Sequence, residues 1–323
     1  MTPTLSLIVP MHNEAGNIDT LYQRLAHVLL PLNISWEMIC INDGSTDETL
    51  NELLKAQSIH KEICIIDLTR NFGKEAALSA GLDFARGEAA IPIDADLQDP
   101  PEIIPQMIEL WQKGFEVVLA KRKTRTGDSF VKRNTAHLFY RIINKLSEVD
   151  IPQDTGDYRL ISRPVINALK QLPERRRFMK GLFAWVGYKT AEIEYERPER
   201  FSGTSKFNYW KLWNFALEGI TSFSDAPLKI ASYLGIIISL LSFLYAIKIV
   251  IDTILFGNPV KGYPSLIVAI LFFSGVQLIA LGIIGEYLGR IYAETKQRPI
   301  YLVRNVWSAE NSSISNNKQR QSL

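Results

Sequence analysis

Two aspartates, Asp94 and Asp96, are the residues whose type and spacing most clearly indicate chemistry, because they stand one residue apart at the end of an apolar run. Two carboxylates so close together cannot both stay ionised in a dry pocket unless a cation compensates them. Mg²⁺ and Mn²⁺ bind carboxylate oxygens and leave coordination positions open for substrate phosphates. The alternative is a turn that starts a helix, and Asp99 in front of Pro100 fits that role. Asp94 and Asp96 lie closer to the strand end, which favours a site for a divalent cation and a diphosphate.

The elements that must position these aspartates follow from the hydrophobic pattern between residues 5 and 120, where short apolar runs alternate with amphipathic helical patterns. The predicted strands are residues 5–9, 36–41, 63–68, 89–93 and 115–120, with further strands at 157–161 and 191–196. The predicted helices lie near residues 18–30, 46–60, 74–85 and 101–113. This alternation is typical of an α/β fold with a parallel sheet covered on both faces. Such sheets bind ligands at the carboxyl ends of their strands, and the segments there (10–14, 42–47, 69–74 and 94–99) are all polar.

The composition excludes one class of partner and indicates a reducing environment. Lys and Arg number 36 against 34 Asp and Glu, so the net charge of +2 gives no support for nucleic-acid binding. The two cysteines, Cys40 and Cys64, stand inside apolar strand-like runs. We therefore expect buried thiols and no disulfide.

Two long apolar stretches, residues 228–251 and 265–287, distinguish the last third of the chain. Each reaches the roughly 20 residues that a bilayer requires, so we predict two transmembrane helices. Lys and Arg flank the pair at both outer ends, which places both termini and the α/β domain on the cytoplasmic side of a multi-pass protein of the inner (plasma) membrane. Gly285 and Gly289 permit close helix packing, and we expect a homo-oligomer, with a tetramer as the specific guess.

A basic amphipathic segment at residues 128–146 separates two of the predicted strands. Its apolar side alternates with a side that carries Lys132, Arg133 and His137. One interpretation is a surface helix packed on the core, and the other is a helix at the membrane interface, where cations meet lipid phosphates.

Three motifs follow predicted strands: residues 9–14 (Val-Pro-Met-His-Asn-Glu), residues 42–47 (Asn-Asp-Gly-Ser-Thr-Asp) and Asp94-Ala95-Asp96. In order and spacing they resemble family-2 glycosyltransferases, whose nucleotide-sugar-binding fold is called GT-A. Within that family the chain looks like the polyprenyl-phosphate branch, which includes dolichyl-phosphate mannose synthases and bacterial bactoprenol glucosyltransferases. The motifs that match this branch are residues 70–74, 156–160, 200–206 and 285–292. The resemblance spans roughly residues 4 to 304, and the Gln-x-x-Arg-Trp element of processive polysaccharide synthases is missing.

The resemblance implies a domain organisation and a set of site residues. The implied domains are a cytoplasmic catalytic GT-A domain (1–227), a transmembrane hairpin (228–290) and a cytoplasmic tail (291–323) that is disordered from about residue 309. The implied donor-binding residues are Pro10, His12, Glu14, Ile41, Asp43, Lys74, Asp94, Ala95, Asp96, Gln98, Arg122, Arg200 and Lys206. The implied metal site is Asp96 with Asp94 and Gln98; the implied catalytic residues are Asp157, Asp96, Arg122 and Lys206. The candidates for the acceptor phosphate are Lys132, Arg133, His137 and Arg159.

The expected activity is inverting transfer of a hexose, with glucose from UDP-glucose as the first choice, to the phosphate of undecaprenyl phosphate, assisted by Mg²⁺ or Mn²⁺. The same acceptor with mannose, N-acetylglucosamine or aminoarabinose is the alternative, and a non-catalytic nucleotide-binding membrane protein is a further one. Asp157 is either a base or a ligand of donor-sugar hydroxyls, and the sequence leaves that choice open.

Neutralising the basic segment provides a first test. Lys132 and Arg133 replaced together by Gln should raise the KM for the lipid acceptor more than the KM for the nucleotide sugar, because interfacial cations attract the lipid phosphate. Steady-state kinetics in detergent measures both constants. Equal changes in the two would rule out an interfacial role.

Overall fold

The computed structural model describes residues 3–123, 155–172, 174–175, 177, 179–196, 226–256 and 262–308 of the chain. Several predictions lie outside these residues and stay predictions: the basic helix at 128–146, the tail from residue 309, and the site residues Lys132, Arg133, His137, Arg200 and Lys206.

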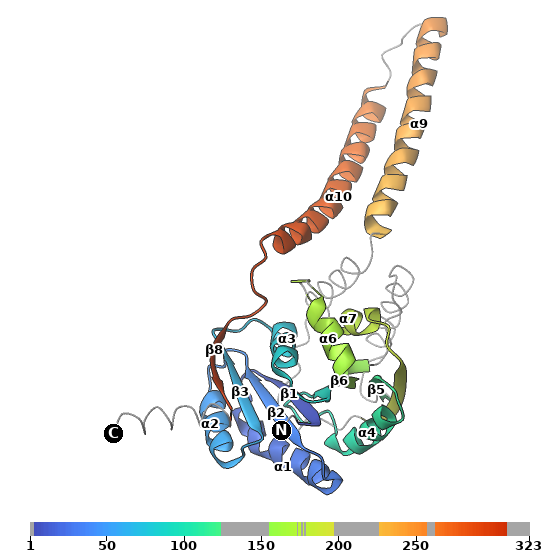
Figure 1. The fold of residues 1–323 in the computed structure, drawn as a ribbon. Coiled ribbons are helices and arrows are strands. Elements are labelled where there is room, and N and C mark those ends of the chain that lie inside the picture. The colour runs from blue at the N-terminus through green and yellow to red at the C-terminus, as the bar shows by residue number, and fades with distance from the viewer. Residues whose placement is uncertain are drawn as a thin grey trace.

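The N-terminal part is an alternation of strands and helices, as the hydrophobic pattern predicts (Figure 1). Its elements are β1 (Leu5–Met11), α1 (Ile18–Leu29), β2 (Trp36–Asn42), α2 (Thr49–Ile59), β3 (Ile63–Leu68), α3 (Lys74–Phe84), β4 (Ala89–Pro92), α4 (Ile104–Gln112) and β5 (Val117–Arg122). They are followed by β6 (Thr155–Ser162), α6 (Arg163–Gln171), α7 (Met179–Trp185) and β7 (Thr190–Tyr195). The chain continues with α9 (Ala226–Phe256), α10 (Tyr263–Thr295) and β8 (Val303–Trp307).

The described strands form one eight-stranded sheet in the order β7-β5-β6-β4-β1-β2-β3-β8. β1 pairs in parallel with β2 and β4, and β2 pairs in parallel with β3, as expected for buried apolar strands. The sheet is mixed, however, because β6 runs antiparallel between β4 and β5, and β8 runs antiparallel beside β3. The five strands predicted between residues 5 and 120 do run in one direction, and the sequence pattern indicated no direction for the later strands, of which β6 and β8 are antiparallel. Apolar content alone does not encode the direction in which a later segment returns to a sheet.

Helices cover both faces of the sheet. One buried cluster joins the sheet to α1, α2 and α4, where Ile18, Leu21 and Leu25 follow the spacing of one helix face. The other cluster joins it to α3, α6 and α7. Cys40 is buried, as its apolar run predicts, whereas Cys64 is only half-buried, and the two do not form a disulfide.

Helix α3 packs unusually close to the sheet because its inner face is made of small residues. A Cβ added at Gly81 would lie 2.2 Å from Cγ2 of Ile8 on β1, so only glycine permits this approach. Ala77 and Ala80 on the same helix are fully buried. This close packing brings the first residue of α3, Lys74, to the carboxyl ends of the strands.

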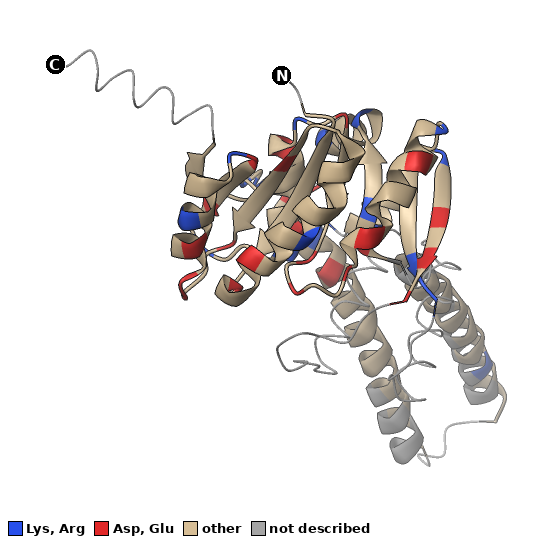
Figure 2. Ribbon diagram, turned by 90° about the horizontal axis from the view of Figure 1, so that it is seen from below, with Lys and Arg blue, Asp and Glu red and all other residues tan. Residues whose placement is uncertain are grey.

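The long helices α9 and α10 extend away from the α/β domain as a side-by-side pair (Figure 1). They carry few charged residues, whereas the α/β domain carries many (Figure 2). In the described part of the chain one segment, the 24 residues of Phe272–Thr295, is long and apolar enough to cross a membrane. The prediction of two transmembrane helices is thus not confirmed by the described residues.

The last described strand, β8, returns from α10 to the edge of the sheet, and the sequence pattern did not predict it. Thr69 donates its backbone N–H to the carbonyl of Leu302 at 3.0 Å, and Arg304 donates to the carbonyl of Thr69 at 2.8 Å. The Arg304 guanidinium also lies 3.6 Å from Oδ2 of Asp67, a carboxylate that is 2% exposed. Asn42 donates to the other Asp67 oxygen at 2.7 Å. The C-terminal strand is thereby tied to the strand that precedes the site.

Replacing Arg304 by Met should lower the thermal unfolding midpoint, because the buried Asp67 carboxylate loses its cation. Since Arg304 is half exposed, we expect a cost of only about 1 kcal/mol. The double variant Asp67→Asn with Arg304→Met should recover most of that loss, since the neutral amide still accepts from Asn42. Additive losses in the double variant would show that the pair is uncoupled.

Candidate active site

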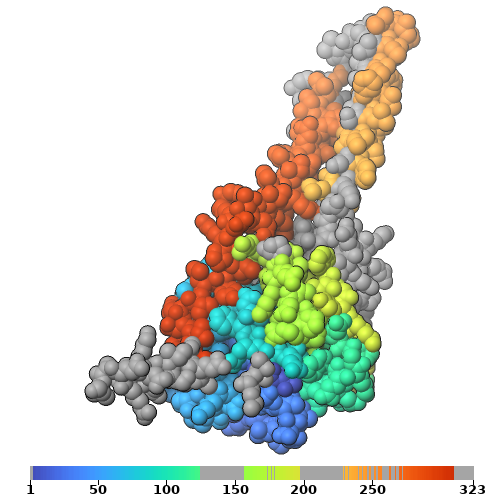
Figure 3. All heavy atoms as spheres, viewed as in Figure 1, coloured from blue at the N-terminus to red at the C-terminus, as the bar shows by residue number. Residues whose placement is uncertain are grey.

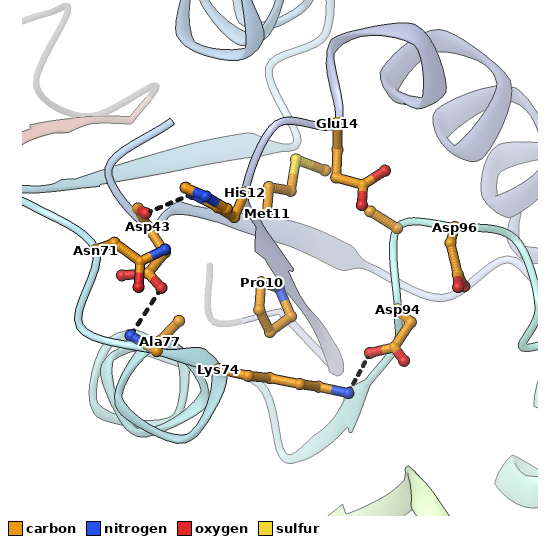
Figure 4. Close-up of a pocket in the computed structure, with 12 residues that line it drawn as sticks. Pro10, Met11, His12, Glu14, Asp43, Asn71, Lys74, Ala77, Asp94 and Asp96 are labelled. Atoms are coloured by element: carbon orange, nitrogen blue, oxygen red, sulfur yellow. Dashed lines mark hydrogen bonds and ion pairs between the residues drawn. The ribbon is translucent and has the colours of Figure 1, made fainter. Parts of the chain in front are cut away.

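A cavity of ≈ 330 Å³ opens where β1, β2 and β4 end and α3 begins (Figure 4). It is lined by Pro10, Met11, His12, Glu14, Asp43, Asn71, Gly73, Lys74, Ala77, Asp94, Ala95 and Asp96. The polar segments that the sequence places after the strands therefore meet at one site. Of the other predicted donor residues in the described chain, Ile41, Gln98 and Arg122 do not line the cavity, and the Ile41 side chain packs in the core beside α3.

The Asp43 carboxylate fixes the loop between β3 and α3. Its two oxygens accept the backbone N–H groups of Phe72 at 2.7 Å and Gly73 at 2.9 Å. Its backbone carbonyl lies 3.0 Å from Nδ1 of His12. Since a carbonyl only accepts, Nδ1 carries a proton, and in the neutral imidazole Nε2 is then the acceptor. Next to it, Gly44 has φ +62°, and a Cβ there would lie 2.4 Å from the Arg70 carbonyl carbon, so the turn requires glycine.

The opposite side of the cavity is acidic, because Glu14, Asp94 and Asp96 all line it. Burial raises the pKa of Glu14, and the carboxylates of Asp96 and Asp94 raise it further, while a hydrogen bond from Asn17 lowers it. Three acidic groups around one cavity repel one another. The site is therefore suited to a cation.

The donor set fits a divalent metal that arrives with its substrate rather than a preformed metal cage. Within the described residues, no three His, Cys, Asp or Glu side chains converge on one point. Asp96 accepts the backbone N–H of Gln98 at 3.2 Å and faces the cavity. The Gln98 side-chain oxygen is buried and has no hydrogen-bond partner in the described part of the chain. Mg²⁺ is commonly held by one or two carboxylates plus substrate phosphates, which matches this arrangement.

Lys74 bridges two carboxylates that come from different strands. Its Nζ lies 2.6 Å from Oδ1 of Asp94, which follows β4, and 2.9 Å from Oδ2 of Asp157 on β6. Burial lowers the pKa of Lys74, but the two carboxylates outweigh that effect and the pKa lies above its ordinary value. Likewise, burial raises the pKa of Asp157, and Lys74 and Lys180 bring it below its ordinary value. The sequence allowed two roles for Lys74, a contact to the substrate or the start of a helix. It did not predict the bridge, because local spacing does not show that two distant strands meet.

Beyond Lys74 lies a second polar cluster, which we call the Asp157 cluster: Arg122, Asp157, Arg159 and Lys180. Arg159 is 2% exposed, donates to the carbonyl of Gly156 at 2.7 Å and lies 4.2 Å above the Phe183 ring. Burial lowers its pKa to about 10. These contacts hold the start of β6 in place, so Arg159 is directed inward. This geometry does not favour the predicted contact with an acceptor phosphate.

Arg122, at the end of β5, is linked to the aspartate loop through Tyr195. Arg122 donates from Nε to the Tyr195 hydroxyl at 3.4 Å, and that hydroxyl donates to Asp99 at 3.3 Å. The other Asp99 oxygen accepts the backbone N–H of Asp94 at 3.4 Å. Asp99 thus supports the loop that presents Asp94, whereas the helical turn that follows has Pro100 at its N-cap and no side-chain cap, so the predicted helix-starting role of Asp99 was wrong.

Comparison with known proteins identifies the class. Residues 6–170 match the model of glycosyl transferase family 2, and residues 226–291 match that of the GtrB C-terminal hairpin. The chain belongs to glycosyl transferase family 2, and it is a glycosyltransferase with a GT-A-like α/β fold.

Several relatives match almost the whole chain. An uncharacterized glycosyltransferase of Synechocystis sp. is 56% identical over 310 residues (96% of this chain, 98% of the relative). The bactoprenol glucosyl transferase of Shigella phage SfV is 52% identical over 304 residues (93% and 98%). A prophage bactoprenol glucosyl transferase homolog of Escherichia coli is 50% identical over 303 residues (94% and 99%). Among solved structures, glucosyl-3-phosphoglycerate synthase from Mycobacterium tuberculosis matches with a TM-score of 0.48 and 17% identity (68% of this chain, 76% of that one), a likeness too distant to inform on ligands.

Glu75, next to Lys74, is a titratable group that the sequence did not single out. Its Oε2 accepts the backbone N–H of Met179 at 3.2 Å, which joins α3 to α7. Burial raises its pKa to about 7, and the Asp157 carboxylate adds to that rise. The folded chain therefore binds more protons at this group than the unfolded chain does between its ordinary pKa of 4.5 and about 7.

The resulting pH dependence is testable. Since unfolding releases a proton from Glu75 in that interval, the free energy of unfolding should fall as pH rises from about 4.5 to about 7. The Glu75→Gln side chain does not ionise, so it is not destabilised as pH rises. The difference between its thermal unfolding midpoint and that of the unsubstituted chain should therefore increase between pH 5 and pH 8, in favour of the variant. Glu109→Gln on the exposed face of α4 serves as the control. A constant offset between Glu75→Gln and the unsubstituted chain at every pH would contradict the raised pKa.

Proposed function

We propose that this glycosyltransferase moves glucose from UDP-glucose to the phosphate of undecaprenyl phosphate at the cytoplasmic face of the membrane. The observation that carries the proposal is the 50–52% identity, over more than nine-tenths of the chain, to proteins named bactoprenol glucosyl transferases. The cavity at the strand ends, with an acidic side and a neighbouring cationic cluster, supports it.

The nucleotide sugar would occupy the cavity. His12, Pro10 and Asp43 lie at the side where the base and ribose would bind, and Nε2 of His12 can accept a hydrogen bond there. Asp96, with Asp94 and Gln98 nearby, would hold Mg²⁺ or Mn²⁺ against the diphosphate. Arg122, with Lys206 and Arg200, would add positive charge as the diphosphate departs.

The reaction requires little proton movement. An oxygen of the lipid phosphate attacks the anomeric carbon of the sugar, and the bond from that carbon to the diphosphate oxygen breaks. UDP leaves with the electron pair, and the anomeric configuration inverts. A divalent metal held by Asp96, with Asp94 and Gln98, would supply charge that stabilises the leaving diphosphate. The second pKa of a phosphate monoester is ~6, so the acceptor is already largely a dianion at neutral pH.

Asp157 then acts by position rather than as a base. Its pKa lies below the ordinary value, so it is ionised at neutral pH and holds a proton poorly. Lys74 occupies its Oδ2, while its buried Oδ1 has no hydrogen-bond partner within the described residues. That oxygen is available to accept from a hydroxyl of the donor sugar.

The membrane part would hold the site beside its lipid substrate. We propose that α9 and α10 both cross the inner membrane as a hairpin (228–290), with the catalytic domain (1–227) and both termini in the cytoplasm. The match of residues 226–291 to a C-terminal hairpin family supports this. Gly285 and Gly289 are exposed on α10, which suits packing between copies in a homo-oligomer, for which a tetramer is the specific proposal.

Asp96→Asn should reduce glucosyl transfer by a factor on the order of 10²–10³, because the diphosphate loses its metal-dependent charge compensation. Transfer of radiolabelled glucose from UDP-glucose to undecaprenyl phosphate in detergent, with Mg²⁺ or Mn²⁺ and then with a chelator, measures this. Glu109→Gln is the matched control, since it neutralises an exposed carboxylate of α4 that does not line the cavity. Full activity of Asp96→Asn, or activity that survives the chelator, would refute the proposed metal site.

The same assay separates the competing functions. If mass spectrometry finds a lipid-linked product with a mannose, N-acetylglucosamine or aminoarabinose donor instead, the proposed sugar is wrong and the proposed lipid acceptor is right. Donor hydrolysis without a lipid product would indicate another acceptor, and tight UDP binding without turnover would indicate a non-catalytic protein.

A further inference from the structure

We propose that Lys180, the second residue of α7, binds the phosphate of the lipid acceptor. The inference deepens the proposed function and rests on it. It assigns to Lys180 the role that the sequence suggested for Arg159.

The position of Lys180 is fixed by the contacts of its own short helix. One residue before it, Met179 donates its N–H to Glu75 of α3. Three residues after it, Phe183 lies under the Arg159 guanidinium of β6. Lys180 is half-buried between these anchors, and its charge interacts with those of Asp157, Arg159, Lys74 and Arg122. It therefore belongs to the Asp157 cluster, none of whose members lines the donor cavity.

Lys74 and the other cations of the Asp157 cluster each have a partner within the described residues. Lys74 is bound to Asp94 and Asp157, and Arg159 is bound to Gly156 and stacked on Phe183. Arg122 donates to Tyr195. No ion pair joins Lys180 to a carboxylate in the part of the chain that the structure describes. Its ammonium therefore has donors available for an incoming anion.

The charge of the cluster matches the acceptor. Four cations (Lys74, Arg122, Arg159 and Lys180) stand against three carboxylates, Asp94, Asp157 and Glu75, and burial raises the pKa of Glu75 to about 7. The cations are therefore in excess, and a phosphate monoester, which carries ≈ −1.5 to −2 at pH 7, is the complementary anion. Lys180 also offsets the repulsion between that phosphate and Asp157, which otherwise opposes binding.

The side from which a membrane lipid would approach the domain also agrees with a role for Lys180. Arg175, in the connection that leads into α7, donates its backbone N–H to the Glu294 carboxylate in the last turn of α10, at 2.8 Å and 3.1 Å. Helices α6 and α7 lie on the side of the α/β domain that faces α9 and α10 (Figures 1 and 3). A lipid held beside the hairpin would therefore present its phosphate to α7, next to Asp157 and Lys74.

Kinetics of the full chain in detergent test the assignment. Lys180→Met should raise the KM for undecaprenyl phosphate at least ~10-fold, as expected when a charge-assisted contact is lost. The KM for UDP-glucose and the Kd for UDP should change less than about twofold, since Lys180 lies outside the donor cavity. Lys180→Arg should recover most of the acceptor affinity. Lys113→Met, at an exposed position directly after α4, is the control and should leave all constants unchanged.

Each outcome has a distinct meaning. An unchanged acceptor KM in Lys180→Met, or equal increases in both KM values, would overturn the role of Lys180 and leave glucosyl transfer to the lipid intact. If the unsubstituted chain forms no lipid product, the proposed function itself fails. Should Lys180→Met unfold, Lys180→Gln, which keeps a polar side chain of similar length, replaces it in the same comparison.

Discussion

The ion bridge of Lys74 with Asp94 and Asp157 is the interaction on which the rest of the site depends. It joins the end of β4 to β6, a strand that enters the sheet antiparallel and from much later in the chain. Its two distances are short, but the Lys74 side chain keeps 44% exposure, so solvent screens the attraction. The bridge therefore contributes little to stability, and its main effect is to position the side chains of the site. It sets an acidic donor cavity on one side and a cationic cluster on the other.

This division explains how one small region can receive two anions. The donor diphosphate would meet carboxylates that are compensated by a metal, whereas the lipid phosphate would meet side-chain cations directly. Both arrangements are prepared by packing that the reaction does not touch. The small inner face of α3 brings Lys74 forward, Asp43 shapes the loop before it, and Arg159 anchors β6 against α7. The return of β8 to the sheet ties the end of α10 to the same domain.

The sequence was sufficient for features that are local. Apolar runs located the strands, polar segments after them located the cavity, and Asp94 with Asp96 lines it as the strand-end argument predicts. The sequence did not predict the contacts between segments that are far apart along the chain. Neither the direction of β6, the pairing of β8, nor the bridge from Lys74 to Asp157 has a signature in spacing, because each depends on how the chain returns in three dimensions. Arg159 illustrates the same limit, since a motif match could not reveal that its guanidinium is buried against Phe183.

The most direct test is the location of Mn²⁺, by its anomalous scattering, in crystals of the full chain grown with UDP. We predict one manganese peak between Asp96 and the UDP diphosphate, with Lys74 still bonded to both Asp94 and Asp157. A manganese ion on the Asp157 side of Lys74, or UDP bound in the cavity with no metal beside Asp96, would contradict the account.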